Sequence, residues 1–181
     1  MIIQKANSIF NSITYKLDNI LFDPGDEWEG FEYVDAVLLT HAHFDHIYGL
    51  NKVLELNPDA KVYTNEDGRD MLLNAKKNLS RYHESDFVFD HPSQIVIVND
   101  GDEIQLEDSH VAKAVFTSGH NPSCITWIID DAIFTGDSYI PGIKIVTNLP
   151  GGNKQLSKES EELILRLSRG KTIYPGHTID F

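Results

Sequence analysis

Residues 41–46 read HAHFDH and follow directly after a short apolar run. Three imidazoles and one carboxylate within six residues are ligand types that zinc, iron and manganese accept. In an extended loop alternate side chains point the same way, so we expect His41, His43 and Asp45 to converge while His46 opens the next helix. A solvated polar loop is the simpler alternative, but it gives no structural reason to place these groups beside an apolar strand. The stretch therefore predicts a metal site.

Three later residues offer the same kinds of ligand, each just beyond a predicted strand and directly after a glycine. They are His120, Asp137 and His177. Glycine allows the backbone to turn sharply at such a position, and the carboxyl ends of strands are where α/β proteins build their sites. These three residues are therefore candidates to complete the site begun by residues 41–46.

Working outward, the rest of the chain alternates between strand and helix signals. Short runs rich in β-branched and aromatic residues, bounded by turn residues, predict strands at 2–10, 12–17, 20–22, 34–39, 61–64, 95–98, 104–106, 111–117, 125–129, 132–135 and 171–174. The turn at 99–102 is expected to join the strands at 95–98 and 104–106 into a hairpin. Helical patterns predict helices from residue 47 to 56, from 66 to about 79, and from Ser157 as N-cap to Gly170. The order indicates one layered α/β or α+β domain over residues 1–181.

Composition narrows the choice of partners and compartment. The 181 residues carry a formal charge of −13, and no cluster of Lys and Arg suited to phosphates occurs, so we expect no nucleic-acid or anionic-membrane surface. Cys124 is the only cysteine, which excludes an intramolecular disulfide and favours a reducing compartment. With no secretory signal pattern at the N-terminus, a cytoplasmic location is the expectation.

The ordered set of motifs resembles the metallo-β-lactamase superfamily, whose signature is H-x-H-x-D-H followed by separate His, Asp and His residues. The loop at 23–25, Asp-Pro-Gly, is similar to the early aspartate loop of that family. In the family this loop supports the H-x-H-x-D-H segment on the side away from the metals. The resemblance covers essentially the whole chain. It implies a four-layer αββα sandwich, in which two mixed β-sheets pack face to face with helices outside, and a binuclear metal site along one edge.

The resemblance also implies a role for each candidate residue. It assigns one metal to His41, His43 and His120, and the other to Asp45, His46 and His177, with Asp137 bridging both. Asp45 is in addition the candidate catalytic residue. The implied cofactors are two divalent ions, with zinc preferred and iron or manganese as alternatives, and the implied nucleophile is a hydroxide bound between them.

Several activities share such a metal shell within the family. True β-lactamases usually lack an aspartate at the bridging position, so Asp137 argues against antibiotic hydrolysis, whereas the glyoxalase II branch resembles this chain at all seven ligands. We therefore expect hydrolysis of a thioester or other small ester of a small molecule. The alternatives are an iron-dependent oxidoreductase similar to the persulfide dioxygenases, a phosphodiesterase or lactonase, and a non-catalytic binding module.

The remaining reactive side chains have weaker assignments. Lys144 and Lys154 follow Asp137, where related enzymes place loops that contact substrate, and both are candidate substrate ligands. Cys124 is expected to be a small buried hydrophobic residue. The residues His83, His91 and His110 are expected to have surface or loop roles.

Overall fold

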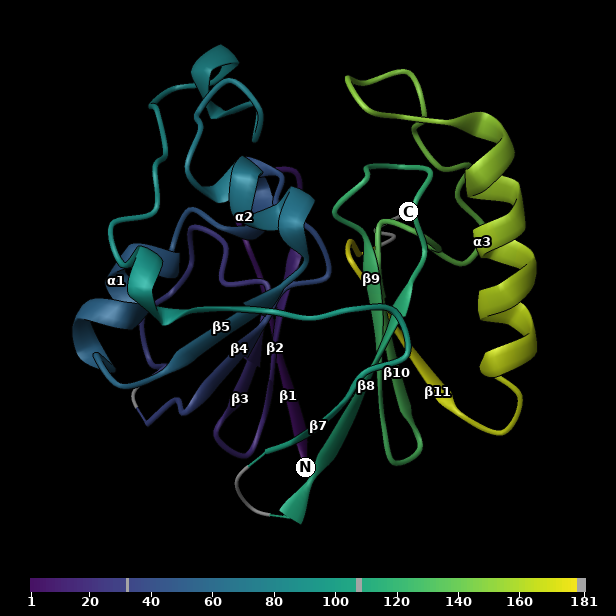
Figure 1. The fold of residues 1–181 in the computed structure, drawn as a ribbon, viewed down its shortest axis with the longest axis horizontal. Coiled ribbons are helices and arrows are strands. Elements are labelled where there is room, and N and C mark those ends of the chain that lie inside the picture. Colours follow the sequence, from purple (N-terminus) through teal and green to yellow (C-terminus); the bar gives the residue numbers. More distant parts are fainter. Residues whose placement is uncertain (32, 107–108, 179–181) are drawn as a thin grey trace.

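A computed structural model describes residues 1–31, 33–106 and 109–178, and its strands form two sheets packed face to face (Figure 1). In spatial order the first sheet contains β1 (Ile2–Ala6), β2 (Ile13–Leu17), β3 (Ile20–Phe22), β4 (Ala36–Leu38), β5 (Lys61–Thr64) and β6 (Ile95–Ile97). The second contains β11 (Thr172–Pro175), β10 (Ala132–Gly136), β9 (Ile125–Ile129), β8 (Val111–Phe116) and β7 (Glu103–Gln105). Each sheet has parallel and antiparallel pairs.

Helices cover the outer face of each sheet (Figure 1). On the first sheet lie α1 (Leu50–Leu56) and α2 (Glu66–Leu72), and on the second lies α3 (Lys154–Leu167). Short 3-10 helices in the described ranges include η1 (Phe44–His46), η2 (Ser80–Tyr82) and η3 (Pro92–Gln94). This arrangement confirms the predicted four-layer αββα sandwich. Across the described ranges, no helix combines the length and apolarity needed to cross a membrane.

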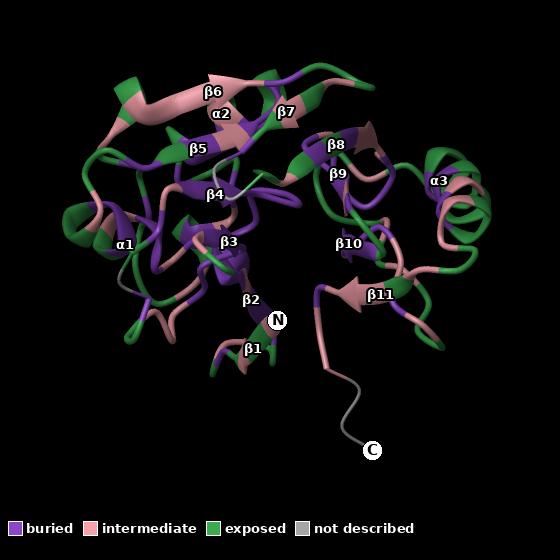
Figure 2. Cartoon of the chain, turned by 90° about the horizontal axis from the view of Figure 1, so that it is seen from below, coloured by how far each residue is buried: buried purple, intermediate pink, exposed green. Residues whose placement is uncertain are grey.

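Buried residues lie on the central strands of both sheets (Figure 2), and the apolar ones among them form one core cluster between the sheets. Phe22 of β3 stacks on Phe134 of β10 with ring centroids 3.7 Å apart. The buried indole of Trp127 donates a hydrogen bond from Nε1 to the carbonyl oxygen of Leu39 at 2.9 Å, which also joins the two sheets. Burial of each such large apolar side chain contributes about 1.5–3 kcal/mol. The core therefore fixes the ends of the strands of one sheet relative to those of the other.

The strand ends that matter for the site lie at one edge of the sandwich. In the first sheet β3 runs parallel to β4, and in the second β10 runs parallel to β11. Parallel strands present their carboxyl ends at the same edge, where the loops that follow them meet. The loops after these four strands contain most of the predicted site residues.

The predicted hairpin at 95–106 is wrong, because its two strands belong to different sheets. β6 pairs in parallel with β5, whereas β7 pairs antiparallel with β8. The turn between them does form, with the Asn99 amide donating to Asp102 Oδ2 at 2.8 Å. The amide of Gly101, however, donates to the carbonyl of Ala114 in β8 at 2.8 Å. The turn is thus hydrogen-bonded to the second sheet, and the chain crosses there from the first sheet to the second.

Helix α2 ends at Leu72 instead of about residue 79. The side-chain oxygen of Asn74 accepts hydrogen bonds from the amides of Lys76 and Lys77, at 3.0 and 3.2 Å. These local bonds replace helical ones. Leu79 then adopts a left-handed conformation with φ of 70°.

Two further boundaries differ from the prediction for local reasons. Asn153, not Ser157, caps α3, because its Oδ1 accepts hydrogen bonds from the next amides along the helix at 3.0 and 3.1 Å. Ser157 is buried within the helix. The first strand ends at Ala6 and not at Phe10, because Phe10 and Asn11 both have positive φ.

Candidate metal centre

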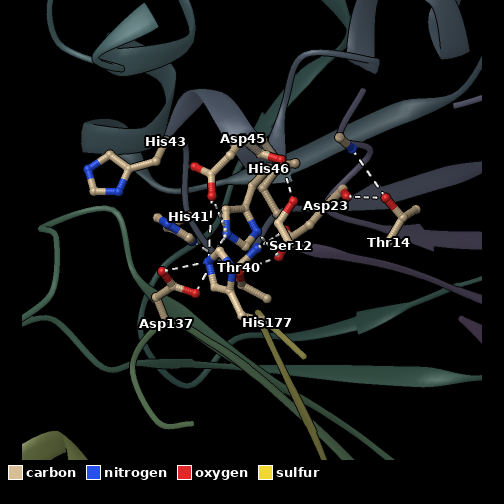
Figure 3. A network of polar contacts seen from close by, with 12 residues as sticks. Ser12, Thr14, Asp23, Thr40, His41, His43, Asp45, His46, Asp137 and His177 are labelled. Carbon is tan, nitrogen blue, oxygen red and sulfur yellow. Dashed lines mark hydrogen bonds and ion pairs between the residues drawn. The ribbon is translucent and has the colours of Figure 1, made fainter. Parts of the chain in front are cut away.

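The seven predicted ligand residues lie together at the sheet edge, and Figure 3 labels all of them except His120. Six of them form two groups of three, and a further group, Asp23, His41 and His46, shares His41 with one and His46 with the other. In each group the candidate ligand atoms lie within 4.8 Å of one another. We call His41, His43 and His120 the first triad, and Asp45, His46 and His177 the second triad. Alternation along an extended loop predicted Asp45 beside His41 and His43. The turn of η1 after His43 instead directs Asp45 to the second triad.

The carboxylate of Asp137 lies between the two triads. Its Oδ2 is 3.5 Å from Nε2 of His120 and 3.2 Å from Nε2 of His177. Its Oδ1 is 3.6 Å from Nε2 of His46. One carboxylate therefore approaches both groups, which is the position that a bridging ligand requires.

Asp23, directly after β3, contacts the loop of residues 40–46 through Thr40 and His46 (Figure 3). Its Oδ1 accepts a hydrogen bond from the Thr40 amide at 2.8 Å, and its Oδ2 accepts one from the Thr40 hydroxyl at 2.5 Å. The same Oδ2 lies 3.1 Å from Nδ1 of His46. With Nδ1 engaged, Nε2 of His46 is left for the centre of the site, as is usual for metal-binding histidines. These contacts agree with the supporting role predicted for the 23–25 loop.

Two backbone carbonyls orient a further histidine in each triad. Nδ1 of His120 lies 2.8 Å from the carbonyl oxygen of Val146, and Nδ1 of His177 lies 2.9 Å from that of Phe10. A carbonyl can only accept, so Nδ1 bears the hydrogen in both rings when they are neutral, and Nε2 faces Asp137, where it can bind a cation or, in the protonated ring, donate to the carboxylate.

His43 has the opposite orientation, and it depends on a residue that the sequence did not single out. Nδ1 of His43 lies 3.0 Å from Nε2 of His120, while its Nε2 lies 2.9 Å from Nδ2 of Asn121. The Asn121 oxygen accepts from the amide and hydroxyl of Ser123, at 2.8 and 2.7 Å. The amide NH2 group must therefore face His43. The only signal in the sequence was the position of Asn121 directly after His120.

The glycines before the later ligands serve two different purposes. Gly119 and Gly136 have φ of 141° and 50°, so their backbones turn as predicted. Gly176 is not in a left-handed conformation. A Cβ atom there would lie 2.2 Å from Oδ1 of Asp137. Close packing against the bridging carboxylate therefore requires glycine at this position.

Burial dominates the electrostatics of the first triad. His41 is fully buried, and desolvation together with the neighbouring His46 holds its pKa well below the usual range. Burial and the adjacent His120 lower the pKa of His43 to about 3. Both rings are therefore neutral at pH 7, the form in which imidazole binds a metal.

Carboxylates dominate the second triad. Burial disfavours a charged His46, but the carboxylates of Asp45 and Asp137 outweigh it and raise its pKa to about 10. For His177, burial is likewise outweighed by the hydrogen bond to Asp137, which raises the pKa. Burial raises the pKa of Asp45. Burial alone would do the same to Asp137, yet the positive charge of His46 holds the pKa of Asp137 well below its usual range.

The donor atoms fit two divalent cations. Nε2 of His41 and Oδ1 of Asp137 are buried without a hydrogen-bond partner, and such unsatisfied groups cost about 1–3 kcal/mol each. A cation held by the first triad and another held by the second would satisfy them, with Asp137 shared. Five imidazoles and two carboxylates suit zinc, iron or manganese.

The predicted substrate lysines line a pocket whose described lining includes no triad residue. Lys144 and Lys154 line a separate pocket of about 690 Å³ together with Lys158, between the loop after Asp137 and the start of α3. One wall of that pocket contains Ile145 and Thr147, the neighbours of Val146, whose carbonyl binds His120. We call this the lysine pocket.

Cys124 behaves as predicted. Its side chain is buried, and burial raises the pKa of the thiol to about 12. The thiol is thus a packing group and not a nucleophile.

An αββα sandwich with two His/Asp groups at one edge defines a metal-dependent class of α/β protein. The family model described as the metallo-beta-lactamase superfamily matches residues 13–177. The chain therefore belongs to the metallo-β-lactamase superfamily, and this membership supports a hydrolase.

Several known proteins are similar to the chain. It is 32% identical to a probable metallo-hydrolase, YqgX, of Bacillus subtilis, over 87% of this chain and 79% of that protein. A hydroxyacylglutathione hydrolase of Francisella philomiragia is 30% identical over 58% of this chain and 34% of its own length.

Solved structures share the fold. The BLEG-1 B3 metallo-beta-lactamase superposes with a TM-score of 0.86 and 25% identity, over 98% of this chain and 92% of that one. A di-iron-bound form of TTHA1623 superposes with a TM-score of 0.80 and 22% identity, over 97% and 92%. The di-iron neighbour means that the fold alone does not define the metal.

Proposed function

We propose that the chain is a metal-dependent hydrolase that cleaves a thioester, or another small ester, of a small molecule. The observation that supports this most directly is the position of Asp137, whose Oδ2 lies 3.5 Å from His120 and 3.2 Å from His177. A carboxylate between the triads implies two neighbouring ion positions. The resemblance to a hydroxyacylglutathione hydrolase supports the thioester.

The side chains of this chain have distinct tasks in the proposal. Bound at the triads, two divalent ions, zinc by preference, would polarise a carbonyl oxygen and supply hydroxide near neutral pH. Asp23 and the carbonyls of Phe10 and Val146 keep the imidazole rings oriented. Asp45 is proposed as both ligand and catalytic carboxylate, because its Oδ2 lies 3.5 Å from Nε2 of His177 and its side chain is 9% exposed, which lets it contact a water.

Charge and leaving group favour the same reaction. Asp45 and Asp137 would contribute two negative charges against the four positive charges of two bound divalent ions, so the loaded centre would be positive and suited to an oxyanion on the substrate. A thiol has a pKa of about 8.5, so a thiolate departs near neutral pH without a general acid. Cleavage of a thioester therefore requires no general acid from the described site.

The direct test is turnover by the metal-loaded protein with three substrate types: a thioester, a lactone and a phosphodiester. We expect thioester hydrolysis to be the fastest, with loss of activity after chelation and recovery on adding zinc. Absence of turnover on all three substrates by fully loaded protein would contradict a hydrolase.

The second candidate is an iron-dependent oxidoreductase with the same ligands, because the neighbour TTHA1623 in its di-iron-bound form shows that the fold can hold iron. Oxygen uptake with glutathione persulfide would reveal it. Metal analysis separates the two, because two zinc ions per chain support hydrolysis and a single iron supports oxidation. A cytoplasmic location, a small-molecule substrate and the absence of nucleic-acid or membrane partners stay predictions.

A further inference from the structure

A second pocket, distinct from the lysine pocket, adjoins the second triad. Its volume is about 480 Å³. Phe10 belongs to its wall, and the carbonyl oxygen of the same residue lies 2.9 Å from Nδ1 of His177. We call it the aromatic pocket. Its lining residues are Ser8, Ile9, Phe10, Asp26, Tyr48, His83, Glu84 and Ser85.

Phe10 occupies an unusual position for a large apolar residue. Its side chain is 63% exposed, although burying it would be favourable. Its φ is 55° and that of Asn11 is 54°, a conformation that costs a bulky residue about 1–3 kcal/mol and is concentrated at functional sites. The chain thus holds an exposed aromatic ring beside the candidate metal centre at a cost in free energy.

Neighbouring rings fix the position of this side chain. Phe10 contacts Phe44 edge-on at 5.8 Å and His83 at 5.9 Å between ring centroids. His83 stacks on Phe44 at 4.8 Å with 27° between the planes, and Tyr48 lies 6.2 Å from His83. The Tyr48 hydroxyl donates to the Ser85 carbonyl at 2.8 Å. Aromatic rings therefore line the pocket in defined orientations.

Two of the lining side chains are acidic, Asp26 and Glu84. Asp26 accepts hydrogen bonds from the Ser8 hydroxyl and the Ile9 amide. Glu84 is exposed and has no hydrogen bond or ion pair with any residue in the described ranges. No Lys or Arg is among the lining residues. Aromatic faces combined with carboxylates attract organic cations and disfavour anions.

We propose that the aromatic pocket binds an organic ammonium group attached to an aromatic or alkyl body, with the body against Phe10 and the charge toward Glu84. This group is either part of the ester substrate, which rests on the proposed function, or a separate small ligand.

The test uses three probes of matched shape on the full-length, zinc-loaded protein at pH 7: phenethylammonium, 2-phenylethanol and 3-phenylpropionate. Binding is followed by chemical-shift changes and calorimetry, so it requires no turnover. We expect the cation to bind most tightly, the neutral probe about tenfold more weakly and the anion more weakly still. Equal affinities for cation and anion, or no binding of the cation, would overturn the proposal even if the protein hydrolyses esters.

Two variants locate the probe. Phe10→Ala keeps the carbonyl that binds His177 but removes the ring, and should weaken phenethylammonium binding about tenfold. Glu84→Gln should remove most of the preference for the cation over the alcohol. Tyr33→Ala is the matched control, because Tyr33 is 82% exposed with φ of 62° but lines neither the aromatic pocket nor the triads. Unchanged binding in Phe10→Ala would overturn the assignment.

Steady-state kinetics with the best ester then separates the two ligand sources. Competitive inhibition by phenethylammonium, with KM raised in Phe10→Ala, assigns the pocket to the substrate. Binding without an effect on KM assigns it to a separate ligand. Both results support the pocket as an ammonium site.

Discussion

The two triads lie side by side, yet different forces set their charge. The first triad consists of imidazoles only, and burial holds the pKa of His41 and His43 below the usual range. The second contains Asp45 and faces Asp137, and these carboxylates raise the pKa of His46 to about 10. His41 and His43 are thus neutral, whereas a cation at the second triad must replace protons. Loading of the two positions should respond differently to mutation.

Removing the shared carboxylate should have the largest effect, because it breaks the link between the triads. In Asp137→Asn one anionic ligand disappears from both positions. We expect metal content to fall from about two ions per chain to one or fewer. Activity should fall by more than the 10–100-fold that is typical when a residue that hydrogen-bonds to a metal ligand is substituted. Elemental analysis and kcat/KM measure both. Retention of two ions and of the wild-type rate would show that Asp137 does not bridge.

Removing one histidine from each triad tests whether the positions are separate. His120→Ala should empty the first position and His177→Ala the second, each lowering metal content and abolishing activity. The Asn121–His43 contact is expected to persist in His177→Ala and the Asp23–His46 contact in His120→Ala, because each belongs to the other triad. Histidine NMR signals report these contacts. Unchanged metal content and rate in His120→Ala would show that this residue is no ligand.

Changing one outer residue per triad gives a smaller and more selective effect. Asp23→Asn would place an NH2 group against Nδ1 of His46 and favour the wrong tautomer, so the second ion should bind about 10–100-fold more weakly. Asn121→Leu removes an NH2 group that faces Nε2 of His43 and favours a hydrogen on Nδ1, the atom that faces the triad, so the first ion should bind no more weakly. Metal titration of each variant, with circular dichroism to check folding, measures the effect. Equal weakening of both ions in either variant would contradict separate support.

Much of this arrangement could be predicted from the sequence, because ligand chemistry is local. The HAHFDH segment and the three ligands after glycines indicated the seven residues, and the strand signals indicated a layered fold. The division of the triads and the role of Asn121 depend on contacts between loops distant in sequence. The prediction of a hairpin at 95–106 was wrong for the same reason, since the turn is hydrogen-bonded to Ala114 in the second sheet.

His110 also lies between two carboxylates but outside the triads. Its substitution should have the smallest of the effects predicted here, and its exposed partners contrast with the buried ones of His46. His110 lies 2.9 Å from Asp18 and 3.0 Å from Asp130, and its hydrogen bonds, first to Asp18 and then to Asp130, outweigh desolvation and raise its pKa. A raised folded pKa stabilises the protein below the unfolded value of about 6.5, and that stability is lost as pH rises through the folded pKa.

Because both partner carboxylates are exposed, the contribution of His110 should be only about 0.5 kcal/mol. His110→Gln should therefore lower the melting temperature by about 1–2 °C at pH 5.5 and by nothing measurable at pH 9. Melting curves of both proteins across this range measure the difference. A difference that grows with pH would contradict the assigned sign.

The central claim is that the two triads and Asp137 bind two metal ions, and the number of metal ions per chain in gently purified wild-type protein tests it most directly. The account predicts about two divalent ions per chain by elemental analysis. A single ion, or none, would contradict it.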